Sequence, residues 1–449
     1  MPTTRGKDDA MECQTIGGAG CTISPERLDA FLSEQLAGLD VDGRSVALVV
    51  PDDTRSCPLP RLLRIVHRNL VDRASELVCV IALGTHEYMS PEKIAEWTTG
   101  DPGADLAEAY PGMEIVNHEW KDPAMLVGVG RISGERMAEL SDGRLSEGSD
   151  VHINRRVVEA DVKLVIGPVL PHEVVGMSGG NKYFIPGVAQ EEFISRTHWV
   201  GALITSSHII GTPAVTPVRA MINEGAAMIP GERYCIAFVV RSHTTELESV
   251  SIGSPEDAWY AQARIGAQTH VEYVDEPMGT ALSVIPDRYH DIWTAAKGFY
   301  KMEPAVAAGG EVIIYAPHIT EVSQVHTEIY EIGYHCRDYF VKQWDRFRQV
   351  PWGVLAHSTH LRGLGSYDPS TGVEADRVRV TLATGIPREV CEAVNLGYRD
   401  PATIDPDEWA RRPGVTVIPD AGEVLYRLRS GGIDGAEGPF TVTSVQPVG

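Results

Sequence analysis

Three short segments combine residues that can bind an anion with residues that can transfer a proton, and each follows a strongly apolar run. They read Asp52-Asp53-Thr54-Arg55, Gly84-Thr85-His86, and a longer stretch from Pro171-His172 to Ser178-Gly179-Gly180-Asn181-Lys182. Histidine titrates near neutral pH, whereas arginine and lysine bind carboxylates. Adjacent glycines let backbone N–H groups converge on an anion. The three segments therefore favour an enzyme that acts on a small anionic substrate.

Each of these residues also has an ordinary structural explanation. The aspartates of residues 52–55 could cap the next helix, and loop histidines such as His86 and His172 are often only hydrogen-bonded within their loops. His198, beside Trp199 in an expected helix, could be a core residue. The short Gly-Gly-Asn-Lys pattern is not a nucleotide-binding P-loop and has low specificity alone. Only the combination of the segments points to catalysis.

The elements that would position these segments alternate between buried strands and helices. Apolar runs buried on both faces and separated by helices are typical of parallel sheets, hence of an α/β fold. Functional groups in such folds follow the carboxyl ends of the strands. The expected strands are Ser45–Val50, Leu77–Leu83, Val162–Val169, Tyr234–Val240, Ala281–Ile285, Glu311–Ala316, Val378–Leu382 and Val415–Pro419. The expected helices are Leu59–Val71, Pro91–Trp97, Gln190–Leu203, Tyr289–Ala307 (stopped by Gly309-Gly310) and Pro387–Val394.

An acidic segment with proline and glycine, VEYVDEPMGT at residues 271–280, interrupts this alternation and predicts a domain boundary near residue 276. We expect a flexible N-terminal arm over residues 1–24 and an N-terminal α/β domain over 25–275 that carries the reactive lysine and histidines. A C-terminal α/β domain over 276–449 would complete the substrate site. Both domains should have mostly parallel sheets, with the active site in the cleft between them.

The composition excludes several classes of protein. The 449 residues include 39 Lys+Arg and 62 Asp+Glu, a formal net charge of −23 with no basic block. Such a charge opposes nucleic acid and anionic membranes, so neither partner is expected. No apolar run approaches the roughly 18 residues of a transmembrane helix, and the N-terminus lacks the apolar stretch of a secretory signal. Seven dispersed cysteines without a CxxC pair argue against a disulfide framework. We therefore expect a cytoplasmic protein.

Taken together, the motifs resemble the lactate racemase family of nickel-pincer nucleotide enzymes. The resemblance rests on DDTR at 52–55, GTH at 84–86, PHEVVGMSGGNKYFIPG at 171–187 and RTH at 196–198. A later segment, Trp293-Thr294-Ala295-Ala296-Lys297, resembles the second-domain element that completes the family's site. The resemblance implies an isomerase, a racemase or epimerase, that acts on a small anionic 2-hydroxy acid.

The resemblance also implies a cofactor and a role for each site residue. The cofactor is nickel pyridinium-3,5-bisthiocarboxylic acid mononucleotide, which holds nickel through a pyridinium carbon and two sulfurs. It would be joined covalently to Lys182, with His198 as the protein's nickel ligand, and separate cofactor-synthesis proteins would load it. His86 and His172 would be the acid/base pair. Asp52, Thr54, Ser178, Gly179 and Gly180 would contact the nucleotide, and Arg55, Thr294 and Lys297 would bind the substrate.

The implied reaction inverts C2 of the hydroxy acid. The α-hydrogen would leave as hydride to the cofactor while one histidine takes the hydroxyl proton, and a planar 2-keto acid would receive hydride on its other face. Thr294 stands where the family usually has glutamine, so a longer acid would fit: malate, an aryl or alkyl hydroxy acid, or a sugar acid. His357, His360 and Arg362 form a further polar cluster without an assigned role.

Two other functions are compatible with the same residues. One is an enolate-type hydroxyacid racemase that works without the pincer cofactor and uses His86 and His172 as its bases. The other is a non-catalytic protein that binds the nickel nucleotide. Two histidines beside Lys182 argue against the second alternative, since a carrier needs neither base.

Overall fold

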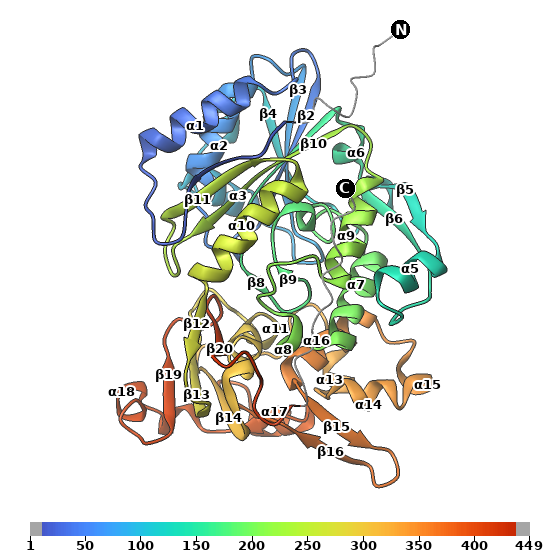
Figure 1. Cartoon of the computed structure of the whole chain (residues 1–449), viewed down its shortest axis with the longest axis vertical. Helices are drawn as coiled ribbons and strands as arrows, with labels where there is room; N and C mark the ends of the chain where they lie inside the picture. Colours follow the sequence, from blue (N-terminus) through green and yellow to red (C-terminus); the bar gives the residue numbers. More distant parts are fainter. Residues whose placement is uncertain (1–10, 437–449) are drawn as a thin grey trace.

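The apolar runs of the N-terminal half assemble into a seven-stranded sheet in a computed structural model that describes residues 11–436 (Figure 1). The strand order is β1-β11-β10-β7-β2-β3-β4; β10, β7, β2, β3 and β4 run parallel, and β11 and β1 add an antiparallel edge. The strands are β1 (Gln14–Gly17), β2 (Ser45–Pro51), β3 (Glu76–Ala82), β4 (Met113–Asn117), β7 (Val162–Pro168), β10 (Glu232–Val240) and β11 (Leu247–Gly253).

Helices cover both faces of this sheet, because successive residues of a strand point in opposite directions. Val46 and Leu48 of β2 lie in one core with leucines of α1 and α2, whereas Ala47 and Val49 lie in a second core with residues of α7, α9 and α10. The helices here are α1 (Pro25–Ala37), α2 (Leu59–Leu70), α3 (Pro91–Thr99), α4 (Leu106–Ala109), α5 (Gly134–Leu140), α6 (Arg155–Glu159), α7 (Glu191–Ile204), α8 (Ser206–Ile209), α9 (Pro217–Ala227) and α10 (Pro255–Thr269).

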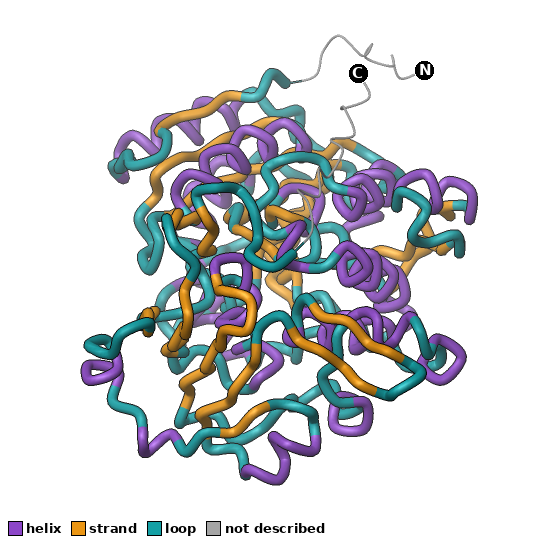
Figure 2. Tube along the Cα trace, turned by 60° about the horizontal axis from the view of Figure 1, so that its bottom comes forward, coloured by secondary structure: helices purple, strands orange, loops and turns teal. Residues whose placement is uncertain are grey.

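A second, five-stranded parallel sheet has the order β18-β17-β14-β13-β19. Its strands are β13 (Met278–Val284), β14 (Val306–Ala316), β17 (Arg379–Thr384), β18 (Gly397–Tyr398) and β19 (Val415–Ile418). Its helices are α11 (Ile292–Ala295), α12 (Lys297–Tyr300), α13 (Ile329–Ile332), α14 (Arg337–Val341), α15 (Trp344–Phe347), α16 (Trp352–Arg362), α17 (Arg388–Ala393) and α18 (Pro406–Trp409). The prediction of two α/β units with mostly parallel sheets is confirmed, and Figure 2 shows helices around the strands of each unit.

Four strand pairs complete the described part of the chain. The antiparallel pair of β5 (Leu126–Ile132) and β6 (Ser149–Asn154), connected through α5, extends the first unit, and β15 (Gly365–Asp368) with β16 (Val373–Asp376) extends the second. β12 (Val271–Val274) pairs in parallel with β20 (Leu425–Leu428). β8 (Pro171–His172) pairs with β9 (Gly176–Met177) in a two-residue ladder directly after β7. This last pair fixes one of the candidate catalytic histidines.

The expected helix over Tyr289–Ala307 is wrong. This segment forms α11, α12 and a 3₁₀ turn at Glu303–Ala305, and β14 already begins at Val306. Pro304 has no N–H to continue a helix and restrains the residue before it, which explains the final break. Gly309 and Gly310 do not stop an element either. They lie inside β14, where the register against β13 shifts, and Gly309 has a positive φ of 77°, which is typical of a bulge.

The expectation of a flexible arm is also wrong for part of its length. Gln14–Gly17 form β1, which pairs with β11 at the edge of the large sheet, and Thr15 Oγ1 lies 2.7 Å from Ser251 Oγ. This edge strand was not predicted from the sequence because its few residues have little apolar character. Residues 1–10 of the expected arm, like residues 437–449 of the expected C-terminal domain, lie outside the described range. The boundary near residue 276 stays a prediction.

The two sheet units contact each other mainly through α7 and α16. Trp199 of α7 stacks on Trp344 of α15 at 5.5 Å between ring centroids, and Ala202 packs with Leu355 of α16. On another side, His243 Nδ1 lies 2.6 Å from Asp420 Oδ2. α7 and α16 both carry histidines that line the candidate site. Within residues 11–436, no helix has the length and apolar character needed to cross a membrane.

Candidate active site

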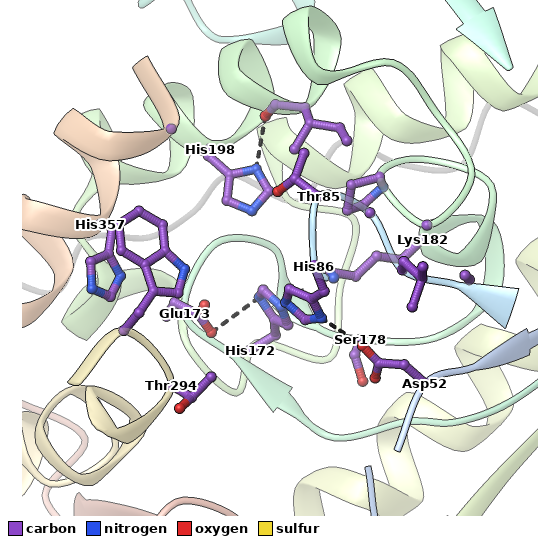
Figure 3. Close-up of a pocket in the computed structure, with 18 of the residues that line it drawn as sticks. Asp52, Thr85, His86, His172, Glu173, Ser178, Lys182, His198, Thr294 and His357 are labelled. Atoms are coloured by element: carbon purple, nitrogen blue, oxygen red, sulfur yellow. Dashed lines mark hydrogen bonds and ion pairs between the residues drawn. The ribbon is translucent and has the colours of Figure 1, made fainter. Parts of the chain in front are cut away.

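A cavity of about 190 Å³ lies between the two sheet units, and residues of both units line it (Figure 3). The first wall comes from the loops that follow β2, β3 and β7 and from α7; it contributes Asp52, Arg55, His86, His172, Glu173, Ser178, Gly179, Lys182 and His198. The second wall comes from α11, α12, α16 and the loop after β14; it contributes Trp293, Thr294, Lys297, His326, His357 and His360. Strand ends that are distant in sequence thus converge on one space, as expected for parallel sheets.

His86 of the first wall is paired with a buried carboxylate. Its Nδ1 lies 2.5 Å from Asp52 Oδ2, and Thr54 Oγ1 donates to the other oxygen of Asp52 at 2.6 Å. Burial opposes ionisation of Asp52, but the attraction and hydrogen bond of His86, together with the charge of Arg55, hold its pKa well below the usual range. The ionised carboxylate orients the ring and stabilises a protonated His86.

His172 has a comparable arrangement at the end of β7. The β8–β9 ladder holds its backbone, and its Nδ1 lies 3.2 Å from the amide N of Val174 and 3.3 Å from Glu173 Oε2. Burial, and then the positive charges of Lys182 and Arg55, lower the pKa of His172 well below its usual value. Nδ1 can accept from Val174 in the neutral ring, whereas a proton on Nδ1 faces Glu173. The ring therefore has a partner in either protonation state.

Three cations of the cavity have no carboxylate partner. In residues 11–436, Arg55, Lys182 and Lys297 make no side-chain hydrogen bond or ion pair, and Lys297 Nζ lies 4.6 Å from the ring centroid of Tyr289. Burial, followed by repulsion from Arg55, lowers the pKa of each lysine to about 7. Unpaired cations in a cavity are suited to an anionic ligand. Half-neutral lysine amines are in addition nucleophilic near pH 7.

Lys182 lies in a 3₁₀ turn over Gly180–Tyr183, and side chains of α9 and α10 hold the residues just before this turn. Arg219 Nη1 donates to Gly179 O at 2.9 Å, and Trp259 Nε1 donates to Ser178 O at 2.9 Å. Gly179 has a positive φ of 86°, and a Cβ on Gly180 would lie 2.7 Å from Cβ of Trp259. The two glycines therefore allow a sharp turn packed against α10.

His198 is oriented by its own helix. Its Nδ1 lies 2.8 Å from Ile194 O, one turn earlier in α7, so Nδ1 carries the proton that bonds this carbonyl. Burial and the charge of Lys182 lower its pKa to about 4, which leaves Nε2 with a free lone pair at neutral pH. A neutral imidazole with a fixed tautomer is a good metal ligand.

The donor set suits a cofactor that brings most of its own metal ligands. In the described part of the chain, no three His, Cys, Asp or Glu side chains are grouped so that they could hold a metal ion. His198 offers Nε2 with a tautomer fixed by its own helix, and Lys182 offers an amine for covalent attachment. Both residues line the same cavity, so they fit a nickel nucleotide that is tethered at one point and ligated at another.

Some predicted site residues do not line this cavity. Thr54 lines a smaller neighbouring cavity, and its hydroxyl is used by Asp52. Gly180 packs against α10, behind the wall. Thr294 does line the cavity, but its Oγ1 donates to Asp291 Oδ1 at 2.8 Å. Arg362 pairs with Asp376 at 2.6 Å, away from the cavity.

Several wall residues were not singled out in the sequence. Glu173 follows His172 directly, and this adjacency was the one available signal. Trp293 and His326 lie on separate elements, and only the fold brings their rings to 4.1 Å between centroids. Asp52 was expected to contact the nucleotide, and its close contact with His86 could not be read from residues 34 positions apart.

Comparison with known proteins indicates the same family as the sequence motifs do. Residues 27–210 match the family described as the lactate racemase N-terminal domain. A lactate racemase of Lactiplantibacillus plantarum is 24% identical over 293 residues, which are 63% of this chain and 62% of that protein. A lactate racemase of Thermoanaerobacterium thermosaccharolyticum is 26% identical over 170 residues, 37% of this chain and 35% of that protein. The matches thus span less than two thirds of the length of these relatives.

Two solved structures share the fold over nearly the whole chain. A crystal structure of a Thermotoga maritima protein has a TM-score of 0.82 and 32% identity, and covers 92% of this chain and 100% of that one. The lactate racemase apoprotein from Thermoanaerobacterium thermosaccharolyticum has a TM-score of 0.69 and 17% identity, and covers 91% of this chain and 94% of that one. The arrangement of both units is therefore shared with known structures.

Proposed function

The chain belongs to the lactate racemase family, and from that premise we propose that it is an isomerase that inverts C2 of a 2-hydroxy acid. We further propose that it works with the nickel-pincer nucleotide joined to Lys182 and ligated by His198. The substrate is a small organic anion, and separate cofactor-synthesis proteins load the cofactor. A cytoplasmic location agrees with seven cysteines that are all unpaired.

One observation carries the proposal: the cavity contains two histidines that each have a carboxylate at Nδ1. Asp52 lies at His86, and Glu173 lies at His172. Inversion needs a proton acceptor for one enantiomer and a proton donor for the other, so two bases are required where a one-directional reaction needs one. The same cavity holds Lys182 and His198.

Different residues of the cavity bind the substrate and transfer protons. Arg55 and Lys297 bind the substrate carboxylate, which keeps C2 within reach of the acid/base pair and of the cofactor. One histidine accepts the proton of the C2 hydroxyl at Nε2, and the carboxylate at its Nδ1 stabilises the resulting imidazolium. The second histidine returns a proton to the oxygen in the inverted product. When bound, the nickel nucleotide supplies a reversible acceptor for the hydrogen of C2, which imidazole alone is too weak a base to remove.

The test is production of the protein together with cofactor-synthesis proteins and nickel, followed by chiral chromatography over a panel of 2-hydroxy acids. We expect inversion of at least one acid, and a mass increase confined to the peptide that contains Lys182. Protein made without the synthesis proteins should be inactive. An active preparation with unmodified Lys182 would instead support the enolate-type reaction, and modified protein that inverts no acid would support a carrier.

A further inference from the structure

The second wall of the cavity carries an aromatic cluster that the proposed chemistry does not use. Trp293 is stacked between two imidazoles, with ring centroids 4.1 Å from His326 and 3.7 Å from His357. His360 follows His357 by three residues in α16, so both side chains lie on the same face of that helix. All four rings line the cavity. We refer to Trp293, His326, His357 and His360 as the second-wall cluster.

The two side-chain nitrogens of His360 are buried without a hydrogen bond from the described part of the chain. The residue is only 2% exposed, yet neither Nδ1 nor Nε2 has a hydrogen bond in residues 11–436. His357 is 8% exposed, and its Nε2 lies a long 3.5 Å from Tyr334 Oη. Buried polar groups are almost always hydrogen-bonded, so a ligand is the natural source of the missing partners.

The cluster presents donors and acceptors without a net positive charge. Burial lowers the pKa of His360 to about 4 and that of His357 well below its usual value, so both rings are neutral at pH 7. A neutral imidazole offers one N–H and one lone pair. A hydroxyl group offers the same combination, and it therefore pairs well with such a ring.

The cluster lies on the far side of the acid/base pair from Lys182 and Asp52, and His198 lies on the same side as His357. In Figure 3, Lys182 and Asp52 lie at one side of the cavity, His86 and His172 lie in the middle, and Thr294 and His357 lie at the other side. If C2 reacts between the two catalytic histidines, the second-wall cluster lies in the same cavity and within reach of the carbon chain beyond C2. These rings would then contact C3 and later carbons.

Two other kinds of substrate chain fit this wall poorly. An alkyl chain would cover the nitrogens of His360 and leave them unpaired. A second carboxylate would approach Glu173. Burial opposes ionisation of this carboxyl, but a backbone hydrogen bond and the charges of Lys182 and Lys297 help to lower its pKa. Hydroxyl groups avoid both penalties, and the C–H face of a polyhydroxylated chain can pack on Trp293.

We propose that the second-wall cluster is a subsite for a hydroxylated carbon chain, with His357 and His360 hydrogen-bonding the hydroxyl groups beyond C2. The substrate is then a sugar acid, epimerised at C2, rather than lactate, an alkyl hydroxy acid or a dicarboxylate. This inference rests on the proposed function and narrows its substrate class.

The first test compares chain-matched acids on the cofactor-loaded protein. We expect kcat/KM for a six-carbon aldonic acid such as gluconate to exceed that for 2-hydroxyhexanoate and for malate by at least about 100-fold, because a site built for hydroxyls rejects analogues without them. Equal or better turnover of lactate, malate or 2-hydroxyhexanoate would overturn the subsite and leave the proposed function standing.

Calorimetric titration of the unloaded protein gives a readout that does not depend on turnover. Gluconate should bind at least about tenfold more tightly than 2-hydroxyhexanoate, since several hydrogen bonds distinguish them. Equal binding would overturn the subsite. If no acid is turned over by protein with modified Lys182, the proposed function fails, and the titration still decides whether the subsite exists.

Variants of one residue separate hydrogen bonding from packing. His360→Leu should lower kcat/KM for gluconate about tenfold with little change for 2-hydroxyhexanoate, whereas His360→Gln, which keeps a donor and an acceptor, should retain most of the preference. His290→Leu is the matched control, because His290 is an exposed histidine that does not line the cavity. A preference that is unchanged in folded His360→Leu protein would contradict the role of His360.

Discussion

The two walls of the cavity are built on different principles. On the first wall, His86, His172 and His198 each have a polar partner that fixes the ring. On the second wall, His360 has no hydrogen-bond partner within residues 11–436, and Trp293 holds its neighbours by stacking. Fixed rings suit proton transfer and metal ligation, which depend on tautomer and orientation. Imidazole nitrogens without a protein hydrogen bond can instead bind polar groups of different substrates.

The difference suggests how one family could keep a reaction while its members change substrate. The family match covers residues 27–210, which include the whole first wall but none of the second. The second wall comes from α11, α12, α16 and the loop after β14, all of which lie outside that match. Changes on the first wall should therefore abolish turnover of every substrate, and changes on the second wall should alter which substrate is preferred.

Replacement of Lys182 should produce the largest effect. Lys182→Arg keeps a positive charge but removes the amine to which the cofactor would be joined, so activity should fall to the background with every 2-hydroxy acid. Chiral chromatography and intact mass measure the two consequences together. If the Lys182→Arg variant carried no cofactor mass and still inverted a 2-hydroxy acid, the proposed roles of the two walls would be wrong.

Replacement of either base on the first wall should be nearly as severe. His86→Gln and His172→Gln should each lower kcat by about 10²–10⁴-fold while Lys182 is still modified. The loss should be similar for gluconate, lactate and malate, because both residues act at C2. If one variant merely changed the order of preference among these acids, that histidine would belong functionally with the second wall.

The pH dependence of Lys182 acetylation tests its environment in the unloaded protein. Its pKa of about 7 means that the reactive neutral amine increases as pH rises from 6 to 7 and is nearly fully formed by pH 8. The rate of acetylation by acetic anhydride, followed by peptide mass, should rise about tenfold between pH 6 and 8 and then level off, whereas ordinary lysines titrate near pH 10.4 and continue to rise. A rate for Lys182 that still climbs between pH 8 and 9 would show an ordinary amine.

The smallest effect is expected at Thr294. Thr294→Val removes the hydrogen bond from Oγ1 to Asp291 and should lower the free energy of unfolding by about 1 kcal/mol. Thr294→Ser retains the hydroxyl and serves as the control in urea denaturation. Since this hydroxyl is already used within the protein, substrate preference should be almost unchanged; a large shift in preference would give Thr294 a direct substrate contact.

The first wall could be predicted from the sequence better than the second. Its residues follow the buried runs Ser45–Val50, Leu77–Leu83 and Val162–Val169, and parallel strands bring the residues after them to one edge. The contacts between those residues could not be predicted. The approach of Asp52 to His86 depends on the conformations of two loops, and a sequence pattern contains no information on such a distance.

The second wall could not be predicted well, because the pattern of apolar residues gave the wrong helices for the segment that forms it. One long helix was expected over residues 289–307, but the segment forms two four-residue helices, and Pro304 lies within a separate 3₁₀ turn at Glu303–Ala305. The true breaks turn Trp293 and Lys297 toward the cavity from two short helices. The sequence shows His357 and His360 as part of a polar cluster, yet only the packing of α16 against α7 shows that they face the site.

The central claim is inversion at C2 by transfer and return of the same hydrogen, and a reaction in D₂O tests it most directly. Cofactor-loaded protein is given one stereoisomer of an acid that it turns over, and NMR follows both the configuration and the isotope at C2. The account predicts that the inverted product accumulates with its C2 hydrogen largely retained as protium, because hydride does not exchange with solvent. Deuterium that enters C2 as fast as inversion occurs would contradict it and would favour an enolate-type reaction.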